Sequence, residues 1–327
     1  MRRILITGAG GFAGRHARAA IAARFPGAEI AGAGLGPGCE IALDVTDAAA
    51  VGRLVAGFRP EACLHLAAIA AAAAVRADPA RAFAVNLGGS LHLAQAVLAA
   101  APECLLVHVS SADGYGASFG SGAALDERAA LAPRSLYAAS KAAADLALGA
   151  LAEDGLRVLR LRPFNHTGPG QSPEFVVPGF ARQVVRIARA DAPAEIVTGA
   201  LEPERDFLDV RDVALAYAAA LERGREIAPG TILNLASGVT RRIGDVLADL
   251  LRLAGVSARV RVDPGRLRRG EIARAVGDAG RARRLLGWAP AIPWERTLAD
   301  VLADWRARAD EDQGGAGTAE RMTRAKA

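Results

Sequence analysis

Short apolar runs alternate with helical patterns along the first half of the chain. Residues 3–7 (RILIT) predict a buried strand, a helix begins near Phe12, and further apolar runs predict strands at 28–34, 62–68, 105–111 and 157–163. Helical patterns stand between them, at about 47–58, 79–100 and 135–154. Strands that alternate with helices predict a doubly wound parallel sheet with right-handed crossovers, so the expected fold class is α/β.

The pattern changes after Pro163. The segment 163–175 is rich in Pro, Gly, Ser and Asn, which predicts an irregular stretch, and a helix at about 212–222, a strand at 231–237 and a helix at about 242–253 follow. We therefore expect a first domain, with the remaining segments forming a smaller, interleaved C-terminal lobe. The domain is expected to span 1–163, with returning segments at about 206–236, and the lobe is expected to span 164–205 and 237–305. Residues 310–327 are expected to form a disordered tail.

Charge and cysteine usage narrow the class of function. The 327 residues carry a formal net charge of +5, but the arginines are scattered and form no basic stripe with interleaved aromatics, so we expect no nucleic-acid partner. Cys39, Cys63 and Cys104 lack metal-ligand spacing, which argues against a zinc site or a disulfide framework and fits the cytoplasm. The apolar start ends at Gly8 and the alanine-rich run 66–75 is short, so we expect no secretory signal and no membrane span.

A glycine-rich loop, TGAGGFAG, separates the first strand from the helix that begins near Phe12. Because Gly8, Gly11 and Gly14 lack side chains, the backbone can approach a pyrophosphate at the helix N-terminus, where N–H groups and the helix dipole favour an anion. A loop between a strand and a helix predicts a Rossmann-like dinucleotide site. The alternative is a tight turn without a ligand.

The choice between NAD and NADP stays open. The end of the second strand, which spans 28–34, lacks the acid that commonly binds the adenosine ribose, and no arginine replaces that acid. Arg15 could meet a 2′-phosphate or lie on the helix surface. Asp44 in LDVTD could accept a hydrogen bond from the adenine amino group, or could cap a helix, as Thr46 or Asp47 also could.

Tyr137 and Lys141 indicate a specific chemistry. Positions i and i+4 share a helix face, so the Lys141 ammonium is expected to lie beside the Tyr137 phenol and to favour its ionised form. Such a phenol next to a bound nicotinamide is the proton donor that carbonyl reduction requires. A serine pair, Ser110 and Ser111, stands upstream.

These motifs together resemble one family. TGAGGFAG, LDVTD, LHLAA, Asn86 in VNLGGS, VSSADGYG and Tyr137 with Lys141 resemble the extended short-chain dehydrogenase/reductases, in the epimerase/dehydratase branch that modifies nucleotide sugars. The resemblance covers residue 3 to about residue 305. Within the branch, the stretch 162–180 with ERDFLDVRD and RLRRGE looks like the GDP-4-dehydro-6-deoxy-D-mannose reductases.

The resemblance implies NAD(P)H-dependent reduction of the C4 ketone of a GDP-4-keto-6-deoxyhexose. Tyr137 would protonate the C4 oxygen as hydride arrives, Lys141 would hold the nicotinamide ribose, and Ser111 rather than Ser110 would bind the carbonyl. Asn86 would order the active-site face. The other implied cofactor contacts are Phe12, Asp44, Val45, Leu66 and Ala67.

Substrate contacts also follow from the resemblance. Asn165 and Arg205 would meet the diphosphate, which arginine binds bidentately, and Arg268 with Glu271 would hold phosphate and ribose. The RLRRGE stretch is equally compatible with a solvated charged turn. For three further polar residues we expect either a ligand contact or a purely structural role: His65, His166 and Gln171.

Asp113 supports an alternative activity. The related 4,6-dehydratases carry an acid two positions after the catalytic Ser or Thr, where it removes and returns a proton. The chain is therefore either a reductase or a nucleotide-sugar 4,6-dehydratase or 4-epimerase. From a different class, it could be a non-catalytic dinucleotide-sensing module. The family also implies a GDP-sugar substrate and a homodimer through the helices that carry Asn86 and Tyr137.

Overall fold

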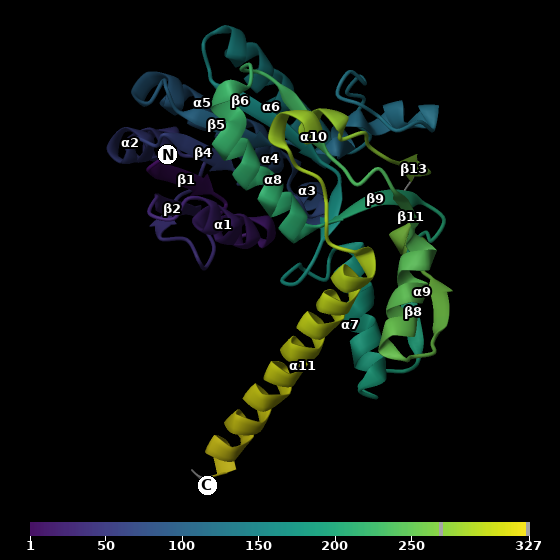
Figure 1. Cartoon of the computed structure of the whole chain (residues 1–327). Helices are drawn as coiled ribbons and strands as arrows, with labels where there is room; N and C mark the ends of the chain where they lie inside the picture. Colours follow the sequence, from purple (N-terminus) through teal and green to yellow (C-terminus); the bar gives the residue numbers. More distant parts are fainter. Residues whose placement is uncertain (268–270, 325–327) are drawn as a thin grey trace. The chain divides into compact units, whose positions relative to one another are not determined.

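The computed structural model describes the backbone of residues 1–267 and 271–324, and the side chains of residues 1–267 and 271–311. The chain forms two compact units that are interleaved along the sequence (Figure 1). Unit 1 contains Met1–His166, Glu204–Thr240 and Ile272–Ala291, and unit 2 contains Thr167–Pro203, Arg241–Glu271 and Ile292–Ala327.

Unit 1 is built on a seven-stranded parallel sheet of order β10-β6-β5-β4-β1-β2-β3. Its strands are β1 (Arg3–Thr7), β2 (Glu29–Gly34), β3 (Ile41–Ala42), β4 (Ala62–His65), β5 (Leu105–Val109), β6 (Val158–Pro163) and β10 (Ile232–Leu235). The strand order reverses between β1 and β4, and the carboxyl ends on either side of such a point are where α/β sheets bind ligands. The predicted α/β class with a doubly wound parallel sheet is confirmed.

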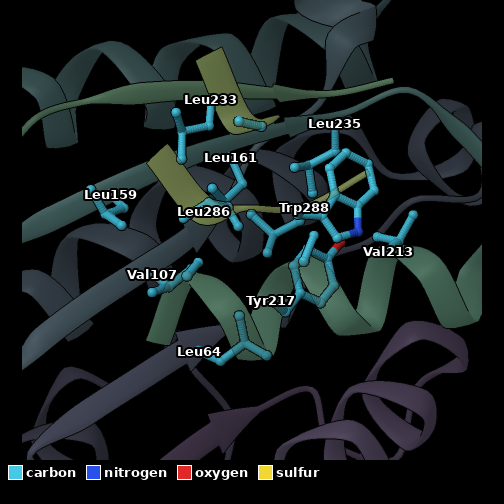
Figure 2. Close-up of a cluster of buried hydrophobic side chains, with 14 of the residues drawn as sticks. Leu64, Val107, Leu159, Leu161, Val213, Tyr217, Leu233, Leu235, Leu286 and Trp288 are labelled. Atoms are coloured by element: carbon cyan, nitrogen blue, oxygen red, sulfur yellow. The ribbon is translucent and has the colours of Figure 1, made fainter. Parts of the chain in front are cut away.

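Each face of the sheet has its own apolar core, because successive side chains of a strand point to opposite faces. Ile4 and Ile6 of β1 belong to one core, and Leu5 belongs to the other. Figure 2 shows the first core, in which leucines of the sheet meet Val213 and Tyr217.

The helices of unit 1 are α1 (Phe12–Arg24), α2 (Ala48–Phe58), α3 (Ala72–Ala77), α4 (Pro79–Phe83), η1 (Ala84–Gly88), α5 (Gly89–Ala100), η2 (Ala112–Ser121), α6 (Leu136–Glu153), α8 (Val210–Arg223), η3 (Gly224–Glu226) and α10 (Gly280–Leu286).

The helix predicted at 79–100 is not uniform. It consists of α4, a π-helical turn (η1) and α5, and the turn contains Asn86. Pro79–Ala100 is long and apolar enough to cross a membrane, but half of its most apolar window is buried inside the protein. Leu93, Ala94 and Val97 of this stretch lie in the second core. A core helix satisfies the same length and composition criteria, so this stretch is weak evidence for a membrane span.

The segment Ile272–Ala291 joins unit 1, although the sequence predicted it in the smaller lobe. The reason is packing, since Leu286 and Trp288 are buried in the first core and the Trp288 indole Nε1 donates to the Asp212 carbonyl at 2.8 Å. The same unit contains the parallel pair β9 (Glu204–Asp209) and β13 (Arg274–Ala275). Strands β7 (Asn165–Thr167) and β11 (Thr240–Arg242) lie where the chain passes between the units.

Unit 2 is smaller and mostly helical. Helices α7 (Val176–Ala188), α9 (Ile243–Ala254) and α11 (Trp294–Arg324) pack together, beside the parallel pair β8 (Glu195–Thr198) and β12 (Arg259–Val262) and the short turn η4 (Pro264–Arg266). The segment from residue 310, predicted as a disordered tail, is helical as far as Arg324 in this structure. A composition poor in apolar residues does not itself exclude a helix, because Ala, Glu, Arg and Met have high helix propensity.

Candidate active site

Helix α6 brings Tyr137 and Lys141 to the carboxyl end of β5. The helix starts after Ser135, whose side chain accepts a hydrogen bond from the Ala138 N–H at 3.1 Å, so Tyr137 lies in the first turn and Lys141 one turn later. Lys141 is 3 % exposed, and its Nζ donates to the carbonyl of Val109, the last residue of β5, at 2.5 Å. The ammonium is therefore held at the ligand-binding edge of the sheet.

The charge state of this pair differs from the expectation. Burial lowers the pKa of Lys141 to about 8, although the Asp145 carboxylate opposes this shift. The pKa of Tyr137 is raised, first by burial and then by the negative charge of Asp113, while a hydrogen bond with Ser111 lowers it. The predicted acidification of the phenol by Lys141 is thus not found in this structure, because burial and Asp113 raise the pKa of Tyr137 and the ammonium donates to Val109 instead.

Ser111 and Asp113 stand beside the phenol. Ser111 precedes η2, and its Oγ accepts a hydrogen bond from the Asp113 N–H at 3.2 Å. Asp113 is exposed, and its carboxylate is close enough to Tyr137 to raise the pKa of the phenol. The structure thus brings Ser111 and Asp113 close to Tyr137, on the helix that also carries Lys141.

Asn86 connects the active-site helix to the loop after β4. Its fully buried amide accepts from the Ile69 N–H at 2.8 Å and donates to the Ile69 carbonyl at 3.1 Å and to the Ser140 Oγ at 2.9 Å. Ser140 in turn donates to the Tyr137 carbonyl at 2.8 Å. These bonds use both the oxygen and the nitrogen of the amide, so Asn86 orders the site through Ile69 and Ser140.

His65 is a core histidine. Its Nδ1 lies 2.6 Å from the Thr7 Oγ1, and its Nε2 lies 3.0 Å from the Ser90 Oγ. Since Ser90 donates its hydroxyl hydrogen to the Asn86 carbonyl, the Nε2 of His65 must carry a proton and Nδ1 must accept from Thr7. Burial and the Lys141 cation lower the pKa of His65 to about 3, which keeps the ring neutral.

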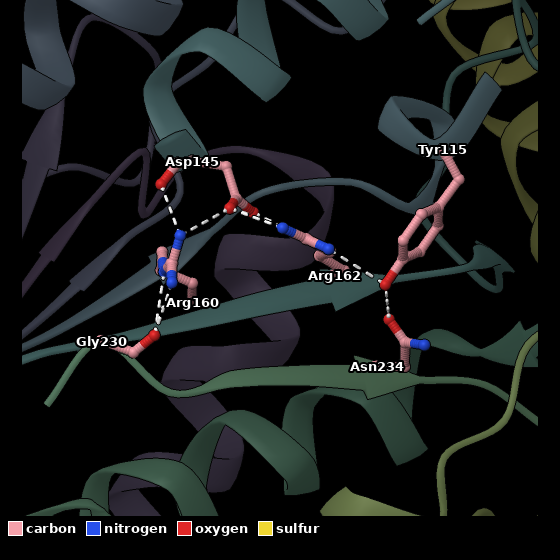
Figure 3. Close-up of polar contacts among 6 residues, drawn as sticks. All are labelled: Tyr115, Asp145, Arg160, Arg162, Gly230 and Asn234. Atoms are coloured by element: carbon pink, nitrogen blue, oxygen red, sulfur yellow. Dashed lines mark hydrogen bonds and ion pairs between the residues drawn. The ribbon is translucent and has the colours of Figure 1, made fainter. Parts of the chain in front are cut away.

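A buried ion network holds α6 on the sheet, and the sequence analysis did not include it. Arg162 of β6 makes two bonds to Asp145, from Nε at 2.9 Å and from Nη2 at 2.8 Å, and Arg160 Nη1 donates to the same carboxylate at 3.1 Å. Figure 3 shows how Arg162 continues to the Tyr115 hydroxyl, which donates to Asn234 at 2.7 Å. The available signal was the pair of arginines in a strand that otherwise reads as buried, because buried arginines need a carboxylate.

The glycine loop fits a pyrophosphate. A Cβ at Gly8 would lie 2.7 Å from the Ala67 nitrogen, and a Cβ at Gly14 would lie 2.3 Å from the Gly8 carbonyl oxygen. Gly11 is the N-cap of α1, and no side chain caps this helix start in the described part of the chain. The backbone N–H groups of the first turn therefore provide the anion site that a dinucleotide requires.

The remaining cofactor candidates lie close to this loop, to α4 or to α5. Leu66 and Ala67 follow β4, and their backbones lie against Gly8, since a Cβ there would be 2.8 Å from the Leu66 carbonyl carbon and 2.7 Å from the Ala67 nitrogen. Asp44 accepts from Arg81 at 2.7 Å and from the Thr46 N–H at 2.9 Å, and these bonds lower its pKa to about 2. Val45 is buried, and its carbonyl lies 3.0 Å from the His92 Nδ1.

The candidate substrate residues are divided between the units. Asn165 is exposed on β7 of unit 1, and the next residue, His166, stacks on Phe12 with ring centroids 6.1 Å apart. Arg205 Nη1 donates to two carbonyl oxygens, Glu204 at 2.9 Å and Ile272 at 2.7 Å.

One described candidate and one bracing residue belong to the second unit. Glu271 is exposed in unit 2, and Arg268 lies outside the described residues. Gln171 is buried and accepts from the Thr167 Oγ1 at 2.7 Å, which fits a bracing role in the loop. Among the residues whose placement is described, no group of three or more His, Cys, Asp or Glu could hold a metal ion.

Comparison with known proteins identifies the family of this chain. Residues 40–301 match the family described as GDP-mannose 4,6 dehydratase. A GDP-6-deoxy-D-mannose reductase of Pseudomonas aeruginosa is 34% identical over 95% of this chain and 99% of that protein.

Solved structures extend the comparison. RMD from Pseudomonas aeruginosa, solved in complex with NADPH, is 32% identical with a TM-score of 0.84 over 94% of this chain and 100% of that one. Thermus thermophilus UDP-glucose 4-epimerase in complex with NAD is 28% identical with a TM-score of 0.81, over 93% of this chain and 99% of that one. These matches confirm the resemblance seen in the motifs, and the chain belongs to the GDP-mannose 4,6 dehydratase family within the nucleotide-sugar epimerase/dehydratase branch.

Proposed function

We propose that this protein reduces the C4 ketone of a GDP-4-keto-6-deoxyhexose with NAD(P)H. The observation that carries the proposal is the placement of Ser111, Tyr137 and Lys141 together at the carboxyl end of β5, in the unit that also contains the glycine loop. The nearly full-length similarity to a GDP-6-deoxy-D-mannose reductase supports the choice of substrate.

Each residue has one role in this proposal. When held by the glycine loop and Lys141, the nicotinamide would supply the hydride for the new C4–H bond as the carbonyl π bond breaks. Tyr137 Oη transfers its proton to the C4 oxygen, and Ser111 Oγ orients that oxygen by a hydrogen bond. A phenol with a raised pKa is fully protonated at neutral pH, which is the state that a proton donor needs. Lys141 binds the ribose of the cofactor and places positive charge near the developing alkoxide.

The direct test is consumption of reduced cofactor. Purified protein mixed with GDP-4-keto-6-deoxymannose and NADPH or NADH should lose the absorbance of the reduced nicotinamide and form a GDP-6-deoxyhexose. Folded protein that consumes neither cofactor with this substrate would exclude the reductase activity. Parallel reactions with UDP- and dTDP-linked 4-keto sugars test the preference for GDP.

A second candidate is a nucleotide-sugar 4,6-dehydratase, favoured by the position of Asp113 next to Tyr137. This enzyme would convert GDP-mannose without added reductant. Under that activity, Asp113→Asn should reduce turnover by at least about a hundredfold, because the acid would move a proton in the reaction. Under the reductase activity the same variant should keep its turnover within a few fold.

We further propose a cytoplasmic homodimer that binds neither nucleic acid nor membranes. The scattered arginines and the half-buried position of Pro79–Ala100 support the absence of those partners. Leu146 of α6 is 59% exposed, and a dimer through α5 and α6 would cover a side chain of this kind. Light scattering of the wild type and of Leu146→Glu tests the dimer, which the charged variant should weaken.

A further inference from the structure

The end of β2 has no acid to bind an unphosphorylated adenosine ribose. NAD-binding sheets commonly use a carboxylate at this place for the ribose 2′-hydroxyl. Here β2 ends at Ala33 and Gly34, and the first acid after it is Glu40. The preference for the 2′-hydroxyl that such an acid would give therefore depends on whether Glu40 can take its place.

Glu40 is engaged elsewhere. Its Oε2 accepts a hydrogen bond from the Gly32 N–H of β2 at 3.0 Å, and its carboxylate also forms an ion pair with Arg18 of α1. A Cβ at Gly32 would lie 2.6 Å from the Glu40 Oε2, so this carboxylate lies directly against the strand backbone. Glu40 thus completes the edge of β2, and its charge is balanced by Arg18.

Arg15 lies where the glycine loop meets the loop after β2. Its Nη1 donates to the Gly10 carbonyl at 3.0 Å. The Gly10 N–H donates to the Cys39 Sγ at 3.2 Å, and a Cβ at Gly10 would lie 2.3 Å from the Pro37 carbonyl oxygen. The two loops are therefore packed together at Gly10, and the guanidinium is fixed beside that contact.

We propose that Arg15 binds the 2′-phosphate of NADPH and that the protein prefers NADPH to NADH. A phosphate monoester carries a charge of about −1.5 to −2 at neutral pH, and a guanidinium binds it by charge-assisted hydrogen bonds. With the Glu40 carboxylate turned to β2 and paired, no unbalanced acid of the β2 loop repels that phosphate. The 2′-hydroxyl of NADH would gain little from the same cation. The inference rests on the proposed function only in requiring a dinucleotide on unit 1.

The test uses adenosine fragments, so it does not depend on turnover. Calorimetry should show that the wild-type protein binds adenosine 2′,5′-bisphosphate at least about tenfold more tightly than 5′-AMP. Arg15→Gln should reduce this ratio to about twofold or less. Arg24→Gln is the control on the same helix, and it should keep the wild-type ratio, because Arg24 lies at the other end of α1 and is paired with Glu222.

Fluorescence titration with NADPH and NADH extends the test to the whole cofactor. Arg15→Gln should weaken NADPH binding by about tenfold and leave NADH binding within about twofold. Equal binding of the two fragments by the wild type, or an unchanged ratio in Arg15→Gln, would overturn the proposal. Selective binding of the bisphosphate by a protein that reduces no GDP-4-keto sugar would retain this proposal and exclude the reductase. Equal use of NADH and NADPH in turnover would overturn this proposal and retain the reductase activity.

Discussion

At the scale of single residues, the site depends on the protonation states that burial imposes. Tyr137 is held as a neutral phenol, His65 as a neutral imidazole, and Lys141 as an ammonium whose pKa is lowered to about 8. Desolvation disfavours the charged form of each group. The charge of Lys141 adds to this effect at His65, as that of Asp113 does at Tyr137, whereas Asp145 partly opposes it at Lys141. The proposed proton donor therefore carries its proton before the substrate arrives.

Tyr137→Phe tests the role of the phenol. The substitution removes one oxygen, so turnover of the 4-keto sugar should fall by about 10²- to 10⁴-fold, while the dissociation constant for NADPH should stay within about twofold. Steady-state kinetics and fluorescence titration measure the two quantities. A variant that retains more than about a tenth of the wild-type turnover would show that another group donates the proton.

Lys141 should also make stability depend on pH. Its pKa is about 8 in the folded protein and higher in the unfolded chain, so the unfolded chain binds more protons between these values and stability rises with pH across that window. The gain from this residue should be about 3 kcal/mol. Urea unfolding of the wild type and of Lys141→Met at about pH 7 and about pH 10 isolates it. The stability of the wild type relative to the variant should increase with pH, and a constant difference would contradict the assigned pKa.

At the scale of elements, α6 is fixed to the sheet by charges that the helix places in register. Asp145 follows Lys141 by four residues and therefore lies near the same face. Arg160 bridges this helix to the turn before β10, since its Nη2 donates to the Gly230 carbonyl at 2.6 Å. Gly149, one turn after Asp145, leaves the space for that guanidinium, because a Cβ there would lie 2.3 Å from the Arg160 Nη1.

Gly149→Ala should be destabilising even though alanine favours helices. The methyl group would displace the Arg160 guanidinium from Asp145 and Gly230, so the free energy of unfolding should fall by about 1–3 kcal/mol. The matched control is Gly52→Ala in α2, where a Cβ would meet nothing within 4 Å. That variant should gain up to about 1 kcal/mol from helix propensity. Urea unfolding compares the two, and a stabilised Gly149→Ala protein would contradict the role given to Arg160.

At the scale of the whole molecule, the two interleaved units contain different residues of the proposed site. Unit 1 contains the sheet, the glycine loop and the proposed catalytic residues, whereas Glu271 belongs to unit 2. The final helix, α11, begins in the packed part of unit 2, where Leu298, Val301 and Leu302 are buried. Its later part coincides with the stretch whose composition predicts a tail.

A chain that ends at Glu311 tests whether the last residues matter. If the tail prediction is right, this truncation should change the melting temperature by no more than about 2 °C and leave turnover within about twofold, because the removed sequence is poor in large apolar residues. Differential scanning calorimetry and the cofactor assay measure both. A loss of several degrees would indicate that the distal part of α11 packs on the rest of the protein.

The features that the sequence predicted and those that it missed differ in their physical origin. The strand, glycine loop and helix at the start of the chain, and the helical spacing of Tyr137 and Lys141, are set by local backbone geometry, which periodicity reports directly. The π-turn at Asn86, the short strand β3 and the return of Ile272–Ala291 to unit 1 were missed, because they depend on contacts between distant residues.

The sequence by itself therefore determined the fold class, the dinucleotide loop and the identity of the proposed acid, since each is carried by residues a few positions apart. Only the tertiary structure decided that Lys141 bonds to Val109, that Asp145 holds α6 through Arg160 and Arg162, and that Glu40 turns to β2. The reason is that desolvation and charge pairing depend on which groups the fold buries together, and no local pattern contains that information.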